Sequence, residues 1–132
     1  MFDDNYINIM AYTIETIIAE KFQTLIEDNI GNTRSKDFYD LYMLITNHFD
    51  SLDGDTIIKA IKRTFKRREY VFDVKEIVKI FEIIKNSEVL KNSYTNRYLP
   101  KNIYAKDVSY EDIMSAISKI IELLEQEIAV AN

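Results

Sequence analysis

A lysine and two aspartates in the first third of the chain have residue types and spacing suited to handling charge. Lys21 falls within an apolar stripe at helical spacing, three residues after Ile18 and four before Leu25. An unpaired buried ammonium is costly, so this lysine must reach water, pair with an acid or line a cavity. The next predicted helix offers Asp37, which flanks its apolar face, and Asp40, which points further toward solvent. If the two helices face each other, the ammonium of Lys21 reaches Asp37.

These residues also fit a purely structural interpretation. The stem of Lys21 could cover the edge of the core while its ammonium reaches water. Asp37 lies in the first turn of its predicted helix, where the helix dipole favours an acid. Charged groups whose pKa is perturbed by their surroundings are often structural. The spacing alone therefore leaves both interpretations open.

A second group of charges closes the third predicted helix. It consists of six cations: Lys59, Lys62, Arg63, Lys66, Arg67 and Arg68. The dipole favours cations at a helix C-terminus, so a solvated helix end explains them structurally. The functional alternative is contact with the phosphates of RNA or of a triphosphate, for which Lys62, Arg63, Lys66 and Arg67 are the candidates.

Helical periodicity along the rest of the chain predicts the elements that position these residues. The predicted fold class is mainly α, an antiparallel bundle of five or six helices. Capping boxes are predicted where Asp73 precedes Glu76 and where Ser109 precedes Asp112. The predicted helices are 13–29, one capped by Thr33 or Ser35 that ends near residue 49, 56–68, one that starts after Asp73, 88–98 and 111–129.

The N-terminal segment has a different pattern. Apolar and polar residues alternate over residues 6–10, which predicts a short strand. The predicted organisation is a single helical domain, 1–132, with a strand-like arm at 1–12, a helix pair at 13–50 and the remaining bundle at 54–129. A lone strand has an open edge, so it would pack as an arm or pair with the same strand of a second copy in a homodimer.

Composition excludes several classes of protein. There are no cysteines and one histidine, which excludes disulfides, cysteine-based zinc sites and His-rich metal sites. One proline and two glycines argue against a β-sandwich or barrel. No apolar run is long enough to cross a membrane, and the acidic N-terminus does not resemble a signal peptide, so a cytoplasmic location is expected. The net charge of −5 argues against extensive coating by nucleic acid but allows a local basic patch.

Two strings within the first 45 residues resemble motifs of a known family. They are YTIETIIAEK at 12–21 and TRSKDFYDLY at 33–42. They resemble the third and fourth motifs of the AbiEii/AbiGii nucleotidyltransferase toxins, which are abortive-infection and toxin–antitoxin proteins of bacteria and archaea. In that family one helix carries an Ala-Glu-Lys core, and the next carries Arg-x-(Lys/Arg)-Asp-x-x-Asp. Residues 19–21 and 34–40 match these cores in order. The resemblance is close over 6–45 and looser elsewhere.

The resemblance implies a function and roles for individual residues. The function is transfer of a nucleotide from a nucleoside triphosphate (NTP) to an RNA acceptor such as the 3′ end of a tRNA. Lys21 would contact the triphosphate, Asp37 would orient Lys21 or polarise the acceptor, and Asp40 would support them. Arg34 and Lys36 would contact phosphates. A cognate antitoxin would be a further partner.

The sequence departs from the family pattern in the catalytic core. The family carries a Gly-Gly/Ser turn and an Asp-x-Asp pair for magnesium before these motifs. Here the two glycines, Gly31 and Gly54, are far apart, and residues 53–55 have the pattern of a turn that starts a helix. The chain thus resembles only the C-terminal helical part, and its predicted strand would be the last strand of the absent sheet. Magnesium and NTP are expected in the complete enzyme, and this part alone is expected to be inactive.

Two further functions remain open from the sequence. The chain could be a free-standing helical module that binds an antitoxin or dimerises. It could also be an RNA-binding domain without catalysis, using the cations of the third predicted helix.

Overall fold

The chain is mainly helical. The computed structural model describes the backbone of residues 4–31 and 35–131, and the side chains of 13–31 and 35–128. Its α-helices are α1 (Asp4–Asp28), α2 (Ser35–His48), α3 (Gly54–Arg67), α4 (Val74–Lys85), α5 (Glu88–Asn92) and α6 (Tyr110–Ala131). A π-helix, η3 (Ser93–Tyr98), continues α5, and the short 3₁₀ turns are η1 (Asn29–Gly31), η2 (Phe49–Ser51), η4 (Leu99–Lys101) and η5 (Ile103–Ala105). None of the helices in the described ranges is long and apolar enough to cross a membrane.

The predicted N-terminal strand is wrong. Helix α1 begins at Asp4 and includes residues 6–10, and no strand occurs among residues 4–31 and 35–131. The five-residue alternation also fits a helical period, because Met10 follows Tyr6 by four residues and precedes Ile14 by four. A helix satisfies its own backbone hydrogen bonds, whereas a lone strand leaves them open. A homodimer formed by pairing such strands therefore loses its structural basis.

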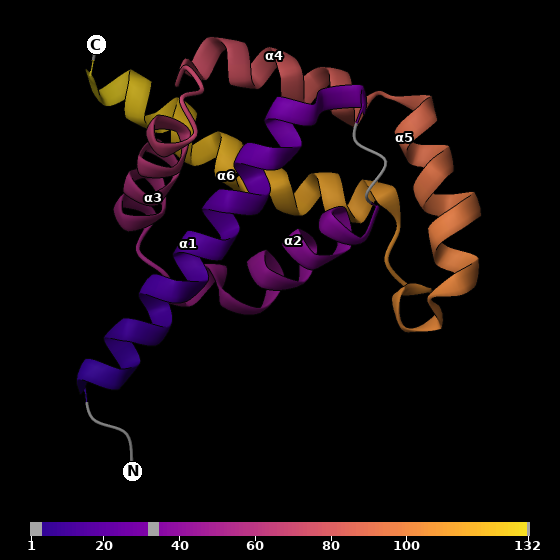
Figure 1. The fold of residues 1–132 in the computed structure, drawn as a ribbon, viewed down its shortest axis with the longest axis horizontal. Coiled ribbons are helices and arrows are strands. Elements are labelled where there is room, and N and C mark those ends of the chain that lie inside the picture. The colour runs from indigo at the N-terminus through magenta and orange to yellow at the C-terminus, as the bar shows by residue number, and fades with distance from the viewer. Residues whose placement is uncertain (1–3, 32–34, 132) are drawn as a thin grey trace.

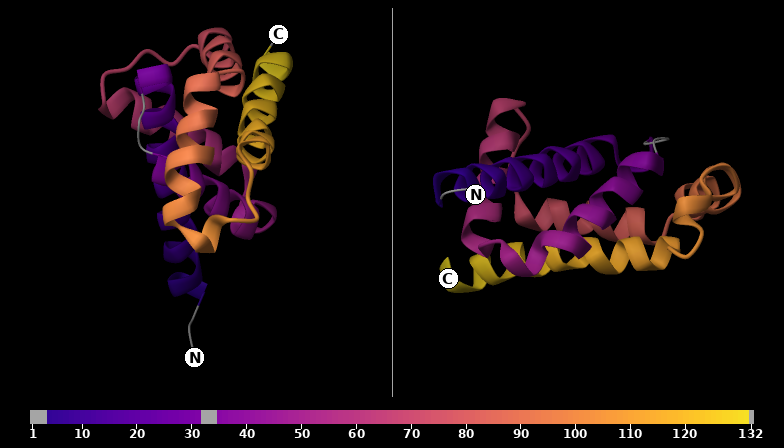
Figure 2. Two further views of the ribbon diagram at one scale, coloured as in Figure 1. Left: turned by 90° about the vertical axis from the view of Figure 1, so that its right-hand side faces the viewer. Right: turned by 90° about the horizontal axis from the view of Figure 1, so that it is seen from below.

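The helices pack in crossing layers. Helix α1 packs mainly against α3 and α2, while α2 and α4 pack against α6. Figure 2 shows α2 and α4 between α1 on one side and α6 on the other. In Figure 1 the helices cross obliquely, with α3 at one end of the molecule and α5 with η3 at the other. The predicted helical class is confirmed, whereas the predicted antiparallel bundle is not.

One apolar core unites these layers. Its fully buried side chains come from α1, α2, α3, α4 and α6 at the spacing that predicted the helices. They include Ile18, Phe22, Leu25, Phe38, Leu41, Ile45, Ile57, Ile61, Phe65, Ile84, Ile113, Ile117, Ile120 and Leu124. Because α1 and α2 share this core, their polar flanks are held side by side.

Both predicted capping boxes start helices. The carboxylate of Asp73 accepts a hydrogen bond from the backbone N–H of Lys75 at 3.0 Å. At α6, the N–H of Asp112 donates to the hydroxyl of Ser109 and the N–H of Ser109 donates to the carboxylate of Asp112, both at 3.0 Å. These bonds satisfy backbone donors that a helix start leaves open. The start of α6 is thereby fixed.

Two buried tyrosines tie η3 and α6 to the rest of the fold. The hydroxyl of Tyr94 donates to the carbonyl of Val108 at 2.7 Å, and that of Tyr110 donates to the carbonyl of Ile84 at 2.7 Å. Burial raises the pKa of Tyr94 to about 12 and also raises the pKa of Tyr110. Both phenols therefore remain neutral hydrogen-bond donors near neutral pH. Their hydrogen bonds hold η3 and the start of α6 in place.

Removing the cap of α6 should destabilise the fold. We expect Ser109→Ala to lower the free energy of unfolding by about 1 kcal/mol, because the N–H of Asp112 loses its acceptor. Urea unfolding measures the change. Ser115→Ala, at an exposed position inside α6, is the matched control and should change stability by less than about 0.5 kcal/mol. Equal effects of the two substitutions would contradict the capping role.

Candidate functional site

Lys21 lies between two carboxylates where α1 meets α2. Its ammonium nitrogen is 3.5 Å from a carboxylate oxygen of Asp37 and 3.5 Å from one of Asp40. The side chains are partly exposed, at 27% for Lys21, 16% for Asp37 and 32% for Asp40. The predicted contact between Lys21 and Asp37 is confirmed. We call these three residues the Lys21 triad.

Asp40 is closer to Lys21 than the sequence indicated. It was expected to point toward solvent, yet its distance to the ammonium equals that of Asp37. Residues three apart lie on the same side of a helix, and the long lysine stem reaches both. Exposed ion pairs contribute little to stability, so the main physical effect of the triad is to orient the ammonium.

A cavity of about 410 Å³ opens beside the triad. Its walls come from the start of α2 on one side and from η3 and η4 on the other. The lining residues are Ser35, Lys36, Asp37, Ser93, Arg97, Tyr98, Lys101 and Asn102. Asp37 belongs to both the cavity and the triad. We call this space the α2–η3 cavity.

The α2–η3 cavity has the electrostatic character of an anion site. It is lined by three cations, Lys36, Arg97 and Lys101, and by one carboxylate, that of Asp37. Ser35, Lys36 and Asp37 are also the first three residues of α2, where backbone N–H groups have no partner within the helix. Cationic side chains and a helix N-terminus both favour a bound phosphate.

A cluster of tyrosines borders the same region. The rings of Tyr39 and Tyr98 have centroids 6.3 Å apart, and those of Tyr39 and Tyr104 are 5.3 Å apart. The hydroxyls of Tyr98 and Tyr104 share a hydrogen bond of 2.8 Å. Burial and this hydrogen bond raise the pKa of Tyr98, and the charge of Asp40 raises it further. We call Tyr39, Tyr98 and Tyr104 the tyrosine cluster; within it, Tyr98 lies within electrostatic reach of Asp40 in the triad.

The family resemblance also predicts that Arg34 and Lys36 contact phosphates. Lys36 is exposed and lines the α2–η3 cavity. Arg34 lies outside the described residues. Lys101 was not predicted as a site residue, because the sequence does not show that η4 lies beside the start of α2 at the cavity.

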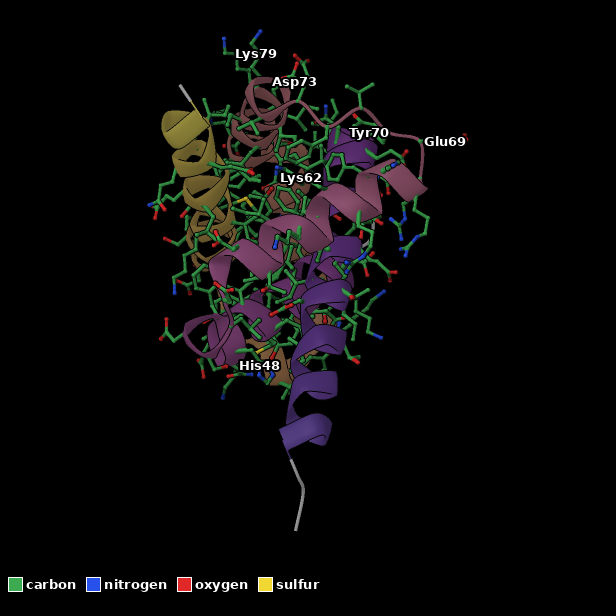
Figure 3. All side chains as sticks on the ribbon, turned by 90° about the vertical axis from the view of Figure 1, so that its left-hand side faces the viewer. His48, Lys62, Glu69, Tyr70, Asp73 and Lys79 are labelled. Atoms are coloured by element: carbon green, nitrogen blue, oxygen red, sulfur yellow. The ribbon has the colours of Figure 1, made fainter. Side chains whose placement is uncertain are left out.

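The basic cluster of α3 does not join the triad. Lys62 pairs with Glu127, and Arg67 pairs with Glu20 at 2.7 Å. Arg68 donates to the side chain of Gln23, which is two positions after Lys21 and lies about 200° around the axis of α1. The cluster thus occupies the other flank of α1, and Figure 3 shows Lys62 on α3 with Tyr70 beyond the end of that helix.

Two predicted members of that cluster have separate surroundings. Arg63 is exposed, and its charge acts on the buried carboxyl of Glu15 on α1. Lys66 is also exposed, and no carboxylate of the described residues pairs with it or with Lys59. All six cations are exposed, and Lys62, Arg67 and Arg68 among them contact side chains of α6 or α1.

Glu15 is a buried acid that sequence analysis missed. It is 4% exposed, and burial raises the pKa of its carboxyl, as does the nearby charge of Asp53, while Arg63 opposes them. The signal was its position three residues before Ile18 and four before Ala19, within the apolar stripe of α1. Glu15 lies toward α3, away from the triad.

The described residues do not fit a magnesium ion. Nowhere in residues 13–31 and 35–128 do three His, Cys, Asp or Glu side chains gather closely enough to hold a metal. The two closest candidates, Asp37 and Asp40, already share the ammonium of Lys21. Magnesium is usually held by one or two carboxylates together with waters and substrate phosphates, and here both carboxylates are already paired with an ammonium.

Comparison with protein-family models gives a match that covers most of the chain. A family model described as "Nucleotidyl transferase AbiEii toxin, Type IV TA system" matches residues 1–116. No curated protein and no solved structure matches the chain. The matched range contains the whole Lys21 triad and the whole α2–η3 cavity.

The buried carboxyl of Glu15 should make stability depend on pH. Its raised pKa means that the folded state favours the protonated form, so wild-type stability falls as pH rises through that pKa. We expect Glu15→Gln to gain stability over wild type between about pH 4 and about pH 7. Urea unfolding at both pH values measures this gain, with Glu125→Gln, at an exposed site on α6, as the control. A smaller advantage at the higher pH would contradict the assignment.

Proposed function

Because this chain belongs to the AbiEii nucleotidyl transferase toxin family, we propose that the Lys21 triad forms part of a nucleotidyl-transfer site. The donor is a nucleoside triphosphate, and the acceptor is RNA, such as the 3′ end of a tRNA. The observation that carries the proposal is the ammonium of Lys21, held 3.5 Å from both Asp37 and Asp40 beside a cation-lined cavity.

The reaction requires positive charge at a fixed position. An acceptor hydroxyl oxygen attacks the α-phosphorus of the triphosphate, and the bond from that phosphorus to the leaving pyrophosphate breaks. The hydroxyl proton passes to water. Negative charge moves onto the phosphate oxygens, and an ammonium already fixed in place stabilises it without further reorganisation. Lys21 supplies this charge, while Asp37 and Asp40 are positioning residues that hold the ammonium.

The charges around the triad support this assignment. Lys21 with its two carboxylates carries a net charge of −1 and alone would repel the phosphates of both the donor and the acceptor. The α2–η3 cavity adds Lys36, Arg97 and Lys101, so the combined region has four cations and two carboxylates, a net charge of +2. A phosphate group is therefore attracted toward the α2–η3 cavity, which lies beside the Lys21 triad.

In this proposal, the residues that hold magnesium lie outside the described residues. The family resemblance implies a metal held by an Asp-x-Asp pair, whereas Asp53 and Asp55 lie at the start of α3, where the Asp53 carboxylate caps the helix. We propose that carboxylates outside the described residues hold the metal in the complete enzyme, and that the Lys21 triad and the α2–η3 cavity contribute charge and phosphate binding.

Antitoxin binding is a second candidate function. The family description includes a type IV toxin–antitoxin system, which makes an antitoxin a proposed partner. Ile30 and Val89 are 56% and 73% exposed, and both line a separate cavity of about 330 Å³ beside α5. Exposed apolar side chains that share a concave surface favour contact with another protein.

Substitution of Lys21 tests the transfer function. In the full-length gene product, we expect Lys21→Met to reduce transfer of labelled nucleotide to RNA by about 100-fold or more, as loss of one charge-stabilising group does elsewhere. Asp40→Asn should cause a smaller loss, because Asp37 still holds the ammonium.

The matched control is Lys59→Met, which removes one exposed lysine from α3 and should leave transfer unchanged. Circular dichroism confirms that each variant keeps its helical content. Full activity in the Lys21→Met protein would remove the triad from the site and leave antitoxin binding as the stronger candidate.

A further inference from the structure

We infer that the α2–η3 cavity and the tyrosine cluster together bind the single-stranded end of the acceptor RNA. The inference rests on the proposed function for the identity of the acceptor. It extends that function by assigning a binding site to Arg97, Lys101 and Tyr104, residues outside the two motifs that define the triad.

The cavity cations differ from Lys62 and Arg67 of α3 in having no carboxylate partner among the described residues. No carboxylate of the described residues forms an ion pair with Lys36, Arg97 or Lys101. On α3, by contrast, Lys62 and Arg67 are paired. Cations without a protein partner keep their full attraction for a phosphate, because no existing ion pair has to be broken.

The shape of the cavity suits one phosphate-bearing unit of a chain. Its volume of about 410 Å³ is within the usual range of small-molecule sites, roughly 300–1,000 Å³. One wall is a π-helix, a rare element that occurs often at functional sites. In η3 the N–H of Leu99 donates to the carbonyl of Tyr94, and this wider turn carries Arg97 and Tyr98 on the cavity wall.

A phosphate site alone does not bind bases. The tyrosine cluster adds aromatic rings on which bases can stack. Tyr104 is 61% exposed, and its ring meets that of Tyr39 edge to face at 5.3 Å. Tyr98 belongs to the cluster and also lines the cavity, so aromatic rings and cations are continuous. Alternation of cations with aromatic rings is typical of proteins that bind single strands, whose unpaired bases stack on the rings.

A single strand fits this site better than a duplex, because its unpaired bases are free to stack on the tyrosine rings. Bases in a duplex stack on each other and expose no face to a tyrosine. A compact cavity also holds one part of one strand, whereas a duplex presents two backbones across a wide groove. The ligand is therefore an unpaired RNA end.

The position of the cavity relative to the triad makes this end an acceptor. Asp37 lines the cavity and lies 3.5 Å from the ammonium of Lys21. RNA seated on Arg97 and Lys101 therefore has its adjacent nucleotide next to the triad. The terminal hydroxyl then lies on the side from which Lys21 contacts the triphosphate.

Binding of short labelled RNA tests this inference. Fluorescence anisotropy of the protein with a single-stranded RNA octamer, over a series of salt concentrations and without nucleotide, gives both affinity and its salt dependence. We expect Arg97→Gln/Lys101→Gln to weaken binding at least tenfold. Loss of two phosphate contacts should reduce the slope of log affinity against log salt by about 1.4, since each contact to a single strand contributes about 0.7.

Two controls distinguish the site from general charge. Lys75→Gln/Lys79→Gln removes the same charge from exposed positions on α4 and should change affinity less than twofold. Tyr104→Ala should weaken binding without changing the salt slope, because it removes stacking alone. Thermal melting confirms that all three variants stay folded.

Several outcomes would overturn the inference. Equal losses in the two double variants would show attraction to net charge. Equal affinity for a duplex of the same sequence would show that unpaired bases are not read. Unchanged RNA affinity in the Arg97→Gln/Lys101→Gln protein would show that the cavity does not bind RNA. Because the assay contains no nucleotide, its failure leaves the Lys21 transfer result intact, and RNA binding without transfer would reject the transfer function alone.

Discussion

The ammonium of Lys21, held at 3.5 Å by Asp37 and by Asp40, is the interaction on which the proposed site depends. It exists because α1 and α2 bury their apolar faces in one core, which leaves their polar flanks in contact. The two carboxylates restrict the ammonium more than they stabilise the fold, since ion pairs at this exposure are weak. Any displacement of α1 against α2 would separate these charges, so the packing of the two helices determines whether the site forms.

The cations of α3 and those of the α2–η3 cavity differ in whether they pair with carboxylates. On α3, Lys62 and Arg67 meet carboxylates of α6 and α1, and they join helices that are distant in sequence. Around the α2–η3 cavity, Arg97 and Lys101 have no such partner among the described residues. The two groups lie at opposite ends of the molecule (Figure 1). A basic run in a sequence therefore gives less information about anion binding than three separate cations that meet at one cavity.

Sequence patterns predicted what depends on local spacing and failed where tertiary placement decides. The helices, the caps at Asp73 and Ser109 and the contact between Lys21 and Asp37 follow from periodicity and capping rules. The start of α1 was missed because five alternating residues fit two periods. The α2–η3 cavity was missed because a π-helix has no sequence signature, and because Lys101 reaches α2 only through the folded loop.

The most direct test of the triad is the response of Lys21 itself to a nucleoside triphosphate. The ε-methylene NMR resonances of the lysines can be followed during titration, with Lys21 identified by its loss in Lys21→Arg. If Lys21 contacts the triphosphate, its resonance shifts and saturates while those of Lys59 and Lys66 stay in place. A shift confined to Lys59 and Lys66, with Lys21 unchanged, would contradict the account and move nucleotide binding to α3.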